Sequence, residues 1–200
     1  MTAFITFEGI DGSGKTTVAA AVHESLVKQG HDVVLTAEPT RTWRGEAVRR
    51  GIDEDTEPVT ESFLFLADRA EHTERIRAWM AAGKIVLCDR YTDSTLAYQG
   101  ARLEGKIAKP LDWLKSLSAR VAIDPDLVLY LRIEPRLGLE RIASRDRLVR
   151  FEEERFLSHV VGHYNLLAHG SPRHRVLDAA RPVAAVTAEA LAAITALLPS

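Results

Sequence analysis

The stretch EGIDGSGKTT, residues 8–17, constrains the fold more than any other part of the sequence. It fits the pattern G-x-x-x-x-G-K-S/T at Gly9, Gly14, Lys15 and Thr16, and it follows an apolar run at 3–7 that is typical of a buried strand. Backbone N–H groups in such a loop surround phosphates, and the helix that begins near Lys15 adds the positive end of its dipole. An accidental glycine-rich turn is the alternative, and the flanking strand and helix disfavour it. The sequence therefore predicts a phosphate-binding loop. In it, Thr16 is expected to bind Mg²⁺, and Lys15 is expected to face solvent and to reach the outer phosphates.

Apolar runs alternate with helical patterns along the whole chain. The runs predicted as strands cover residues 3–7, 32–37, 84–91, 127–131 and 175–177. Periodicity and capping residues predict helices at 15–29, within 38–51, at 56–83, from 92 or 93, at 111–122, from 135 to about 144, at 152–169 and at 183–198. Strands separated by helices form parallel sheets that bind ligands at their carboxyl ends. We therefore predict an α/β fold with a five-stranded parallel sheet covered by helices on both faces.

Length and composition narrow the class of protein. Two hundred residues fit one domain, and a hydrophobic fraction of 46% is ordinary for a soluble globular protein. The N-terminus lacks the pattern of a signal peptide, and no apolar run is long enough to cross a bilayer, so we expect a cytoplasmic protein without a membrane partner. A net charge of −2 gives no basic field for nucleic acid, and the single Cys88 excludes an internal disulfide.

Arginines gather where the predicted loops lie. Arg90 follows the third strand, Arg69 lies one helix away, and Arg141, Arg145, Arg147 and Arg150 crowd one short segment. Planar guanidinium groups suit phosphoryl oxygens, so these side chains indicate a second phosphate-bearing ligand. The alternatives are a solvated helix face for the cluster, and for Arg69 and Arg90 ion pairs with Asp68, Asp89 or Glu38.

Two other groups of residues carry less weight. His159 and His163 lie four residues apart, but the sequence HVVGH lacks the glutamate of H-E-x-x-H and shows no third ligand, so no metal site is predicted there. Trp43, Trp79 and Trp113 are scattered rather than arrayed as a stacking platform, which favours packing roles.

Five motifs in this order resemble the thymidylate kinase family nearly end to end. They are EGIDGSGKTT, EPT at 38–40, FLFLADRAEH at 63–72, CDRYTDSTLAYQG at 88–100 and PDLVLYL at 125–131, followed by an arginine-rich segment and DA-x-x-P at 178–182. The resemblance implies a single P-loop nucleoside monophosphate kinase domain over residues 1–200, with a short lid at about 141–151. It also implies a Mg²⁺-dependent homodimer that transfers the γ-phosphoryl group of ATP to dTMP, giving dTDP for dTTP synthesis.

The same resemblance implies roles for individual residues. The residues expected at ATP are Gly9, Asp11, Gly12, Ser13, Gly14, Lys15, Thr16, Thr17, Arg141, Arg145, Asp178 and Arg181. The residues expected at dTMP are Asp11, Glu38, Phe65, Arg69, Arg90, Ser94, Thr95, Tyr98 and Gln99. The catalytic group is Lys15, Arg145, Arg90 and Asp11. The metal is expected on Thr16 and, through water, on Asp89.

At the acceptor, the resemblance implies that Phe65 stacks on thymine and Arg69 pairs with the acceptor edge of the base. Arg90 is expected to hold the acceptor phosphate. Ser94 or Thr95, together with Gln99, fall where the family contacts the base, and the ring of Tyr98 is expected to crowd the 2′ position.

The sequence also departs from the family pattern. Many bacterial members read EPGG where this chain has Glu38, Pro39 and Thr40. Members differ in whether the catalytic arginine lies in the phosphate loop or the lid, and here Gly12 and Ser13 occupy the loop, so the lid must supply it, with Arg145 best placed. Two other functions stay open, namely a kinase for another nucleoside monophosphate and a P-loop switch that hydrolyses nucleotide.

Overall fold

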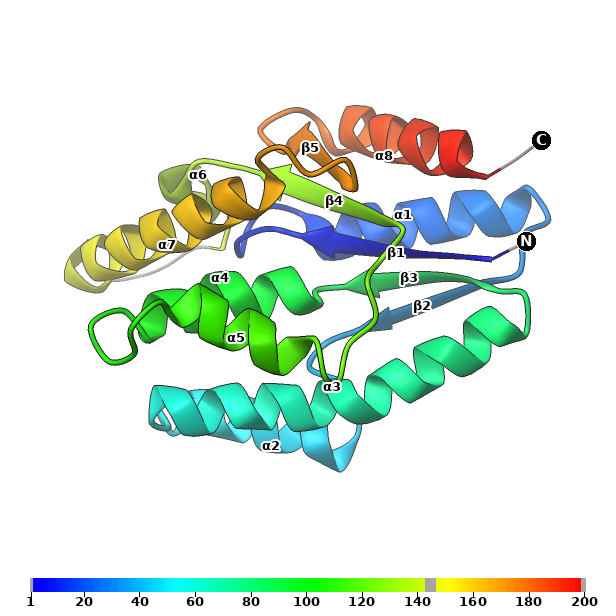
Figure 1. Cartoon of the computed structure of the whole chain (residues 1–200). Coiled ribbons are helices and arrows are strands. Elements are labelled where there is room, and N and C mark those ends of the chain that lie inside the picture. The colour runs from blue at the N-terminus through cyan, green and yellow to red at the C-terminus, as the bar shows by residue number, and fades with distance from the viewer. Residues whose placement is uncertain (1, 143–146, 199–200) are drawn as a thin grey trace.

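A single five-stranded sheet forms the centre of the chain, whose computed structural model describes residues 2–142 and 147–198 (Figure 1). The strands are β1 (Ala3–Glu8), β2 (Val33–Ala37), β3 (Ile85–Asp89), β4 (Leu127–Arg132) and β5 (His174–Asp178). All neighbouring strands pair in parallel, in the order β2-β3-β1-β4-β5. This confirms the predicted five-stranded parallel sheet.

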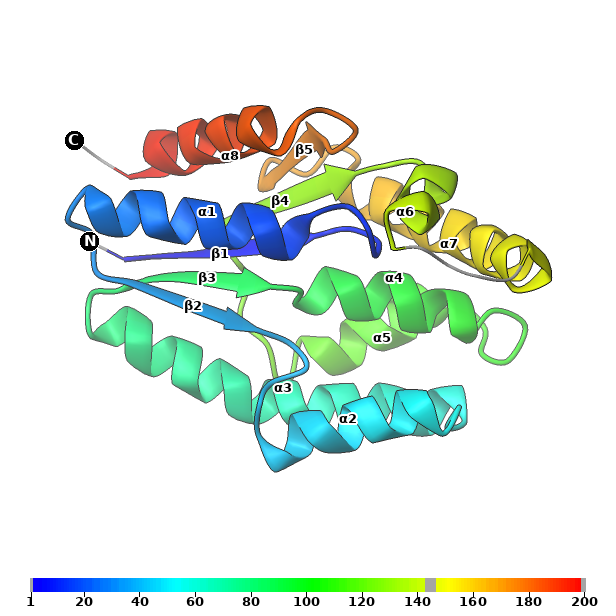
Figure 2. The same ribbon diagram turned by 180° about the vertical axis from the view of Figure 1, so that it is seen from behind.

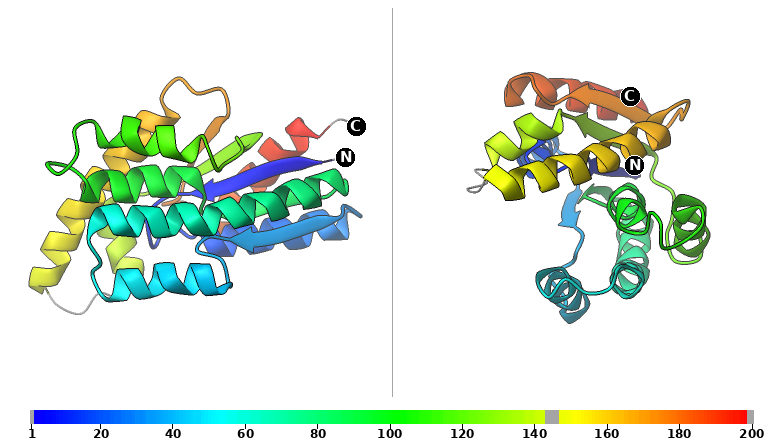
Figure 3. Two further views of the ribbon diagram at one scale, coloured as in Figure 1. Left: turned by 60° about the horizontal axis from the view of Figure 1, so that its bottom comes forward. Right: turned by 90° about the vertical axis from the view of Figure 1, so that its left-hand side faces the viewer.

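Helices cover both faces of this sheet (Figures 1 and 2). They are α1 (Lys15–Lys28), α2 (Trp43–Asp53), α3 (Pro58–Ala81), α4 (Thr92–Arg102), α5 (Pro110–Ser118), α6 (Pro135–Arg141), α7 (Arg147–Ala168) and α8 (Val183–Leu197). Helices α1 and α8 lie side by side on one face, and α3, α4 and α7 lie on the other (Figure 3). The predicted arrangement of layers is therefore confirmed.

The central strand β1 shows why the sequence forms this sheet. Phe4, Ile5 and Phe7 are fully buried although they alternate between the two faces, as expected for a strand covered on both sides. Helix α1 packs an apolar stripe against the sheet through Val18 and Val22. The strand and the helix on either side of the phosphate loop are thus held by the main hydrophobic core, and the loop is held by both.

Several helix boundaries differ from the sequence prediction. Helix α5 ends at Ser118 rather than at residue 122, and α7 begins at Arg147 rather than at residue 152. Helix α4 begins at Thr92, so neither Thr92 nor Asp93 is its N-cap. The N-cap is Tyr91, whose backbone N–H donates to the Glu8 carboxylate across the sheet, 2.9 Å away. A side chain distant in sequence therefore satisfies a donor at the helix start, which local patterns do not reveal.

The carboxyl ends of the three neighbouring strands β1, β2 and β3 lie at the same edge of the sheet (Figure 1). Gly9 follows β1, Glu38 follows β2, and Asp89 ends β3. The phosphate loop, the EPT loop and the start of α4 therefore meet at one place, as the alternation of strands and helices predicts.

Candidate functional site

The phosphate loop is held against α6 and β4 by close backbone contacts. Gly9, with φ +142°, lies so near β4 that an added Cβ would come 2.5 Å from the Leu131 carbonyl oxygen. Gly12, with φ +76°, faces α6, where a Cβ would come 2.2 Å from the Gly138 carbonyl oxygen. No side chain fits at either position without a shift of the backbone. The glycines of the motif are therefore required by the neighbours of the loop as well as by its own conformation.

Lys15 corrects one expectation from the sequence, because its side chain does not face solvent. The residue is only 6% exposed, and its Nζ donates to the Ile10 carbonyl oxygen, 2.9 Å away. Burial and the nearby Arg90 guanidinium lower the pKa of Lys15 to about 7, although Asp11 acts in the opposite direction. The Ile10 carbonyl oxygen gives the buried ammonium a hydrogen-bond partner within the loop itself.

A cavity of about 640 Å³ opens beside the phosphate loop. Its lining consists of Asp11, Gly12, Gly14, Lys15, Thr16, Thr17, Arg141, Ala180, Arg181, Pro182 and Val183. The Arg141 Nη1 donates to the Ala179 carbonyl oxygen at 2.9 Å and to that of Gly12 at 3.3 Å. Most of the residues predicted to bind ATP therefore share one space, and the side chain of Val183 is an addition that the sequence did not indicate.

Among the described residues predicted at ATP, three lie outside this lining. Gly9 and Ser13 belong to the inner side of the loop, and Ser13 is 3% exposed. The Asp178 carboxylate accepts a hydrogen bond from the backbone N–H of Ala180 at 3.0 Å, so it shapes the loop that borders the cavity.

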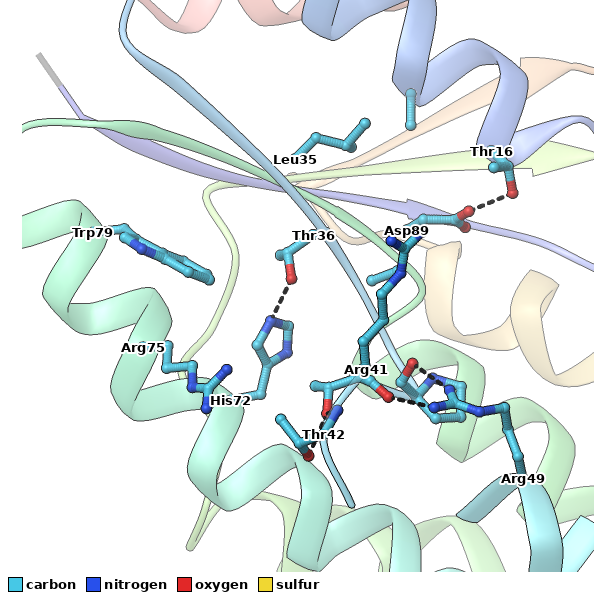
Figure 4. A pocket seen from close by; sticks show the side chains of 14 residues that line it. Thr16, Leu35, Thr36, Arg41, Thr42, Arg49, His72, Arg75, Trp79 and Asp89 are labelled. Carbon is cyan, nitrogen blue, oxygen red and sulfur yellow. Dashed lines mark hydrogen bonds between the residues drawn. The ribbon is translucent and has the colours of Figure 1, made fainter. Parts of the chain in front are cut away.

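Thr16 and Asp89 form a pair of hard oxygen donors at the start of α1 (Figure 4). The Thr16 hydroxyl donates to Asp89 Oδ2 at 2.5 Å. Asp89 Oδ1 is buried and has no hydrogen-bond partner among the described residues. Mg²⁺ binds through one or two protein oxygens together with water and phosphate, so this pair suits such an ion. Within residues 2–142 and 153–198, no group of three His, Cys, Asp or Glu side chains is arranged to hold a metal ion by itself.

Arg90 and Asp11 meet above the phosphate loop. The Arg90 Nη2 donates to Asp11 Oδ1 at 2.6 Å, and its Nη1 donates to the Gly9 carbonyl oxygen and to Ser94 Oγ, each at 3.2 Å. Burial alone would raise the pKa of Asp11, but Arg90 and Lys15 outweigh it and hold that pKa below its usual value. The Tyr98 ring lies against the Arg90 guanidinium, with 5.1 Å from its carbon to the ring centroid. Arg90 pairs with Asp11, which was not among its expected partners.

A second cavity, of about 390 Å³, lies between α3, α4 and α7. Its lining consists of Asp11, Pro39, Ile52, Glu61, Phe65, Arg90, Ser94, Tyr98, Gln99, Arg102 and Phe156. Phe65, Ser94, Tyr98, Gln99, Asp11 and Arg90 were predicted at dTMP, and the structure places all six here. Phe156 packs edge-on against Tyr98, with ring centroids 6.2 Å apart.

Sequence reasoning missed several residues of this second cavity, among them Glu61, Arg102 and Phe156. A signal for Glu61 existed, because Glu61, Phe65 and Arg69 recur every four residues and therefore share a face of α3. No sequence signal linked Phe156 to this face, since it reaches the cavity from α7, far along the chain.

Arg69, Glu38 and Thr95 lie behind the second cavity rather than in its lining. Arg69 is 1% exposed, and its Nε and Nη2 donate to Glu38 Oε2 at 2.9 and 2.5 Å. Its Nη2 also donates to Thr95 Oγ1 at 2.9 Å. His72 Nδ1 lies 2.8 Å from the other Glu38 oxygen. The ion pair between Arg69 and Glu38, one of the alternatives from the sequence, is therefore present, and Arg69 keeps only Nη1 without a partner among the described residues.

A third cavity, of about 540 Å³, lies along β2 and reaches Thr16 and Asp89 (Figure 4). The EPT loop lines this cavity. The Thr40 hydroxyl donates to Asp68 at 2.5 Å. Arg49 donates to the carbonyl oxygens of Pro39 and Thr40 at 3.1 and 2.8 Å. The Arg41 side chain runs toward Asp89 (Figure 4). The loop that departs from EPGG is thus anchored by Thr40 and adds a cation, Arg41, that sequence reasoning did not single out.

Comparison with known proteins agrees with this geometry. A family model described as thymidylate kinase matches residues 7–190. The chain belongs to the thymidylate kinase family. A probable thymidylate kinase of Methanosarcina mazei is 44% identical over 181 residues, which cover 89% of this chain and 88% of the relative. A probable thymidylate kinase of Natronomonas pharaonis is 40% identical over 198 residues (97% and 98%), and a thymidylate kinase of Desulfovibrio desulfuricans is 42% identical over 214 (98% and 96%).

Two observations complete the description of this member of the thymidylate kinase family. Arg145, the expected catalytic arginine, lies outside the described residues, as do the side chains of Arg147 and Arg150. Across the part of the chain that the structure covers, none of the helices combines the length and the apolar character that crossing a membrane requires.

Proposed function

We propose that the chain transfers the γ-phosphoryl group of ATP to dTMP, giving ADP and dTDP. One observation carries this proposal: Asp11, in the phosphate loop, lines both the 640 Å³ cavity and the 390 Å³ cavity. The first cavity has the backbone N–H groups and cations of a nucleoside triphosphate site, and the second has aromatic rings, arginines and the Gln99 amide, which suit a nucleoside monophosphate. ATP in the 640 Å³ cavity, the donor cavity, and dTMP in the 390 Å³ cavity, the acceptor cavity, would meet at Asp11, as direct transfer between them requires.

The residues between the cavities supply positive charge where phosphates meet. The acceptor phosphate is already anionic, so the reaction requires alignment and charge neutralisation rather than an activated nucleophile. Lys15 exchanges the Ile10 carbonyl oxygen for outer phosphate oxygens, and Arg90 offers its guanidinium to the acceptor phosphate. Asp11, Ser94 and the Tyr98 ring hold Arg90 in place before the substrate arrives. This preorganisation lowers the reorganisation needed in the transition state.

Magnesium is part of the proposal. Thr16 and Asp89 would hold the ion, with the free Asp89 Oδ1 as acceptor for a metal-bound water. When bound, Mg²⁺ neutralises charge on the donor phosphates. Arg41, which runs toward Asp89, adds positive charge on the far side of that pair.

The remaining features rest on the family resemblance. We propose that the chain is one domain with a lid at about 141–151, that Arg145 in the lid covers the transferring phosphoryl group, and that the protein is a cytoplasmic homodimer that serves dTTP synthesis. The short α6, which packs on the phosphate loop through Gly138, leads directly into this lid. A lid connected in this way can close when the donor site fills.

A substrate panel tests the proposed function. A coupled assay measures kcat/KM with ATP and Mg²⁺ for dTMP, dUMP, dCMP, AMP and GMP. We expect dTMP to be the best acceptor, because Phe65, Tyr98 and Gln99 line the acceptor cavity together. A panel led by AMP or GMP would contradict the proposal and favour a kinase for another monophosphate. Hydrolysis of ATP that no acceptor accelerates would favour a nucleotide switch.

A further inference from the structure

Glu61 is a buried carboxylate in the wall of the acceptor cavity. It is 1% exposed and lies on α3, where its Oε1 accepts a hydrogen bond from Gln99 Nε2 at 3.0 Å. Its Oε2 lies 3.2 Å from Arg102 Nη1, and Arg102 in turn pairs with the exposed Asp55 at 2.7 Å. A buried carboxylate requires a cationic partner and hydrogen-bond donors. Arg102 supplies the cation and Gln99 donates one hydrogen bond, while Oε2 accepts no hydrogen bond from the described residues. Glu61 is therefore held in one position by groups from α4.

This contact determines which way the Gln99 amide points. A carboxylate only accepts hydrogen bonds, so Gln99 must turn its NH₂ group toward Glu61 and its carbonyl oxygen away from it. Gln99 is 3% exposed, and its Oε1 has no hydrogen-bond partner among the described residues. A buried acceptor without a donor costs free energy, which a ligand N–H would recover.

Arg69 offers a second buried polar group without a partner among the described residues. Arg69 Nη1 is buried and has no partner among the described residues, because Glu38 takes its Nε and Nη2. Arg69 Nη2 also donates to Thr95, which lies one helical turn before Gln99 on α4. Helices α3 and α4 thus leave one donor and one acceptor without partners among the described residues: Gln99 lines the 390 Å³ cavity together with Phe65, and Arg69 lies behind that lining.

We infer that Glu61 is a positioning residue that orients the Gln99 carbonyl oxygen toward a ring N–H of the acceptor base and thereby selects thymine over cytosine. Thymine offers a donor at N3 and an acceptor at O4, which match Gln99 Oε1 and Arg69 Nη1. Cytosine offers an acceptor at N3 and an amino donor at C4, so both pairings are reversed. An arginine cannot reverse its polarity, whereas a glutamine can by rotating its amide, and Glu61 prevents that rotation. The inference rests on the proposed function and adds the residue that sets its choice between thymine and cytosine.

Glu61→Gln tests the inference, because the new amide can accept from or donate to Gln99 and no longer fixes its direction. The measurement is kcat/KM for dTMP and for dCMP in the parent and the variant. We expect the ratio of dTMP to dCMP to fall by roughly tenfold or more, the scale set by one mismatched hydrogen bond in a specific site. Asp55→Asn is the matched control, because it removes the exposed partner of Arg102 and leaves Glu61 in place. Its ratio should stay within about twofold of the parent.

The outcomes separate this inference from the proposed function. A parent protein that phosphorylates dTMP best, together with an unchanged ratio in Glu61→Gln, overturns the inference and leaves the function standing. A parent that prefers a purine monophosphate overturns the function itself. Thermal unfolding of each variant excludes a loss of structure as the cause. If Glu61→Gln does not fold, Gln99→Met, which keeps the volume and removes the amide, is expected to lose the preference for dTMP over dCMP, and a retained preference counts against the inference.

Discussion

Gly12 of the phosphate loop and Gly138 of α6 touch through their backbones. A Cβ on Gly12 would lie 2.2 Å from the Gly138 carbonyl oxygen, and a Cβ on Gly138 would lie 2.8 Å from that of Asp11. Two glycines facing each other allow α6 to lie directly on the loop that holds the phosphates. The helix that leads into the proposed lid is therefore in contact with the phosphate loop, and any side chain at this contact must separate the two.

Gly12→Ala is expected to weaken ATP binding and to lower the midpoint of thermal unfolding, because the added methyl group forces the loop away from α6. Gly14→Ala is the matched control for thermal unfolding, but not for ATP binding because Gly14 lines the 640 Å³ cavity: Gly14 also has positive φ, at +87°, and a Cβ there meets nothing within 4 Å. The free energy of unfolding of the control should fall only by the cost of a left-handed backbone at a residue with a Cβ, about 1–2 kcal/mol. Equal losses of thermal stability in Gly12→Ala and Gly14→Ala would show that the contact with Gly138 has no effect.

The lowered pKa of Lys15 predicts that the protein takes up a proton when ATP binds. With a pKa of about 7 in the free protein, the amine is largely neutral at pH 8, and triphosphate oxygens raise its pKa and restore the charge. Calorimetric titration at pH 8 in two buffers of different ionisation enthalpy should report uptake of about one proton, and at pH 6 almost none. Lys15→Arg keeps its charge at both pH values and should show no uptake. Identical enthalpies for the parent in both buffers at pH 8 would contradict the prediction.

The raised pKa of Glu8 predicts that the free energy of unfolding falls as the pH rises toward about 8. Burial and the neighbouring Asp93 raise its pKa to about 8, although Ser94, Arg90 and the Tyr91 N–H favour the charged form. The folded state therefore holds a proton that the unfolded state has released above about pH 4.5, so the contribution of Glu8 to stability is present at acidic pH and is lost as the pH rises through about 8.

Glu8→Gln, which keeps a hydrogen-bonding group at this position, should gain stability relative to the parent as the pH rises from about 5 to about 9. The limiting slope for one proton is about 1.4 kcal/mol per pH unit. Chemical denaturation at several pH values measures it, with the exposed Glu24→Gln on α1 as the control. A difference between Glu8→Gln and the parent that does not change with pH would sink the assignment.

The sequence predicted the sheet and the meeting of its loops because apolar runs and helical periods are local signals. The strands of the structure match the predicted runs to within one or two residues at most ends. Contiguous motifs of the family likewise indicated the phosphate loop, Phe65, Tyr98 and Gln99, which line the cavities, and their roles at the substrates stay predictions. These features depend on neighbours in the chain or on the resemblance, and both are present in the printed sequence.

Other features depend on partners that are distant in sequence. The burial of Lys15 follows from how the loop closes on its own carbonyl, and the start of α4 at Thr92 follows from Glu8 across the sheet. Phe156 reaches the acceptor cavity from α7, and Arg102 is drawn toward Glu61 by a buried charge. Only tertiary packing determines such pairs, because several partners were equally compatible with the composition of each segment.

Tyr98 predicts discrimination against ribose. Its ring lines the acceptor cavity and packs on Arg90 and Phe156, while its hydroxyl donates to the Asp11 carboxylate at 3.2 Å. Tyr98→Ala should relax selection of dTMP over its ribose analogue by about 1–3 kcal/mol, the scale of a steric effect in a pocket. Tyr98→Phe keeps the ring and should keep the selection, with a weaker hold on Asp11. The ratio of kcat/KM for the two acceptors checks both variants, and an unchanged ratio in Tyr98→Ala would move the role elsewhere.

Arg141 and Arg145 are predicted to act at different stages, although both belong to the segment 141–151 that we propose as the lid. Arg141 already binds the carbonyl oxygens of Gly12 and Ala179, which border the donor cavity, so Arg141→Ala should raise KM for ATP with a smaller change in kcat. Arg145 is the proposed transition-state cation, since the phosphate loop carries Gly12 and Ser13 where other family members place an arginine.

An arginine that covers the transferring phosphoryl group contributes on the order of a thousandfold or more to kcat. Arg145→Ala should therefore lower kcat steeply and leave KM for dTMP nearly unchanged, because the interaction strengthens mainly in the transition state. Steady-state kinetics of Arg141→Ala, Arg145→Ala, Arg147→Ala and Arg150→Ala separate the four residues. If Arg145→Ala keeps kcat within a few-fold of the parent while Arg150→Ala loses it, the catalytic cation lies in the first turn of α7 instead.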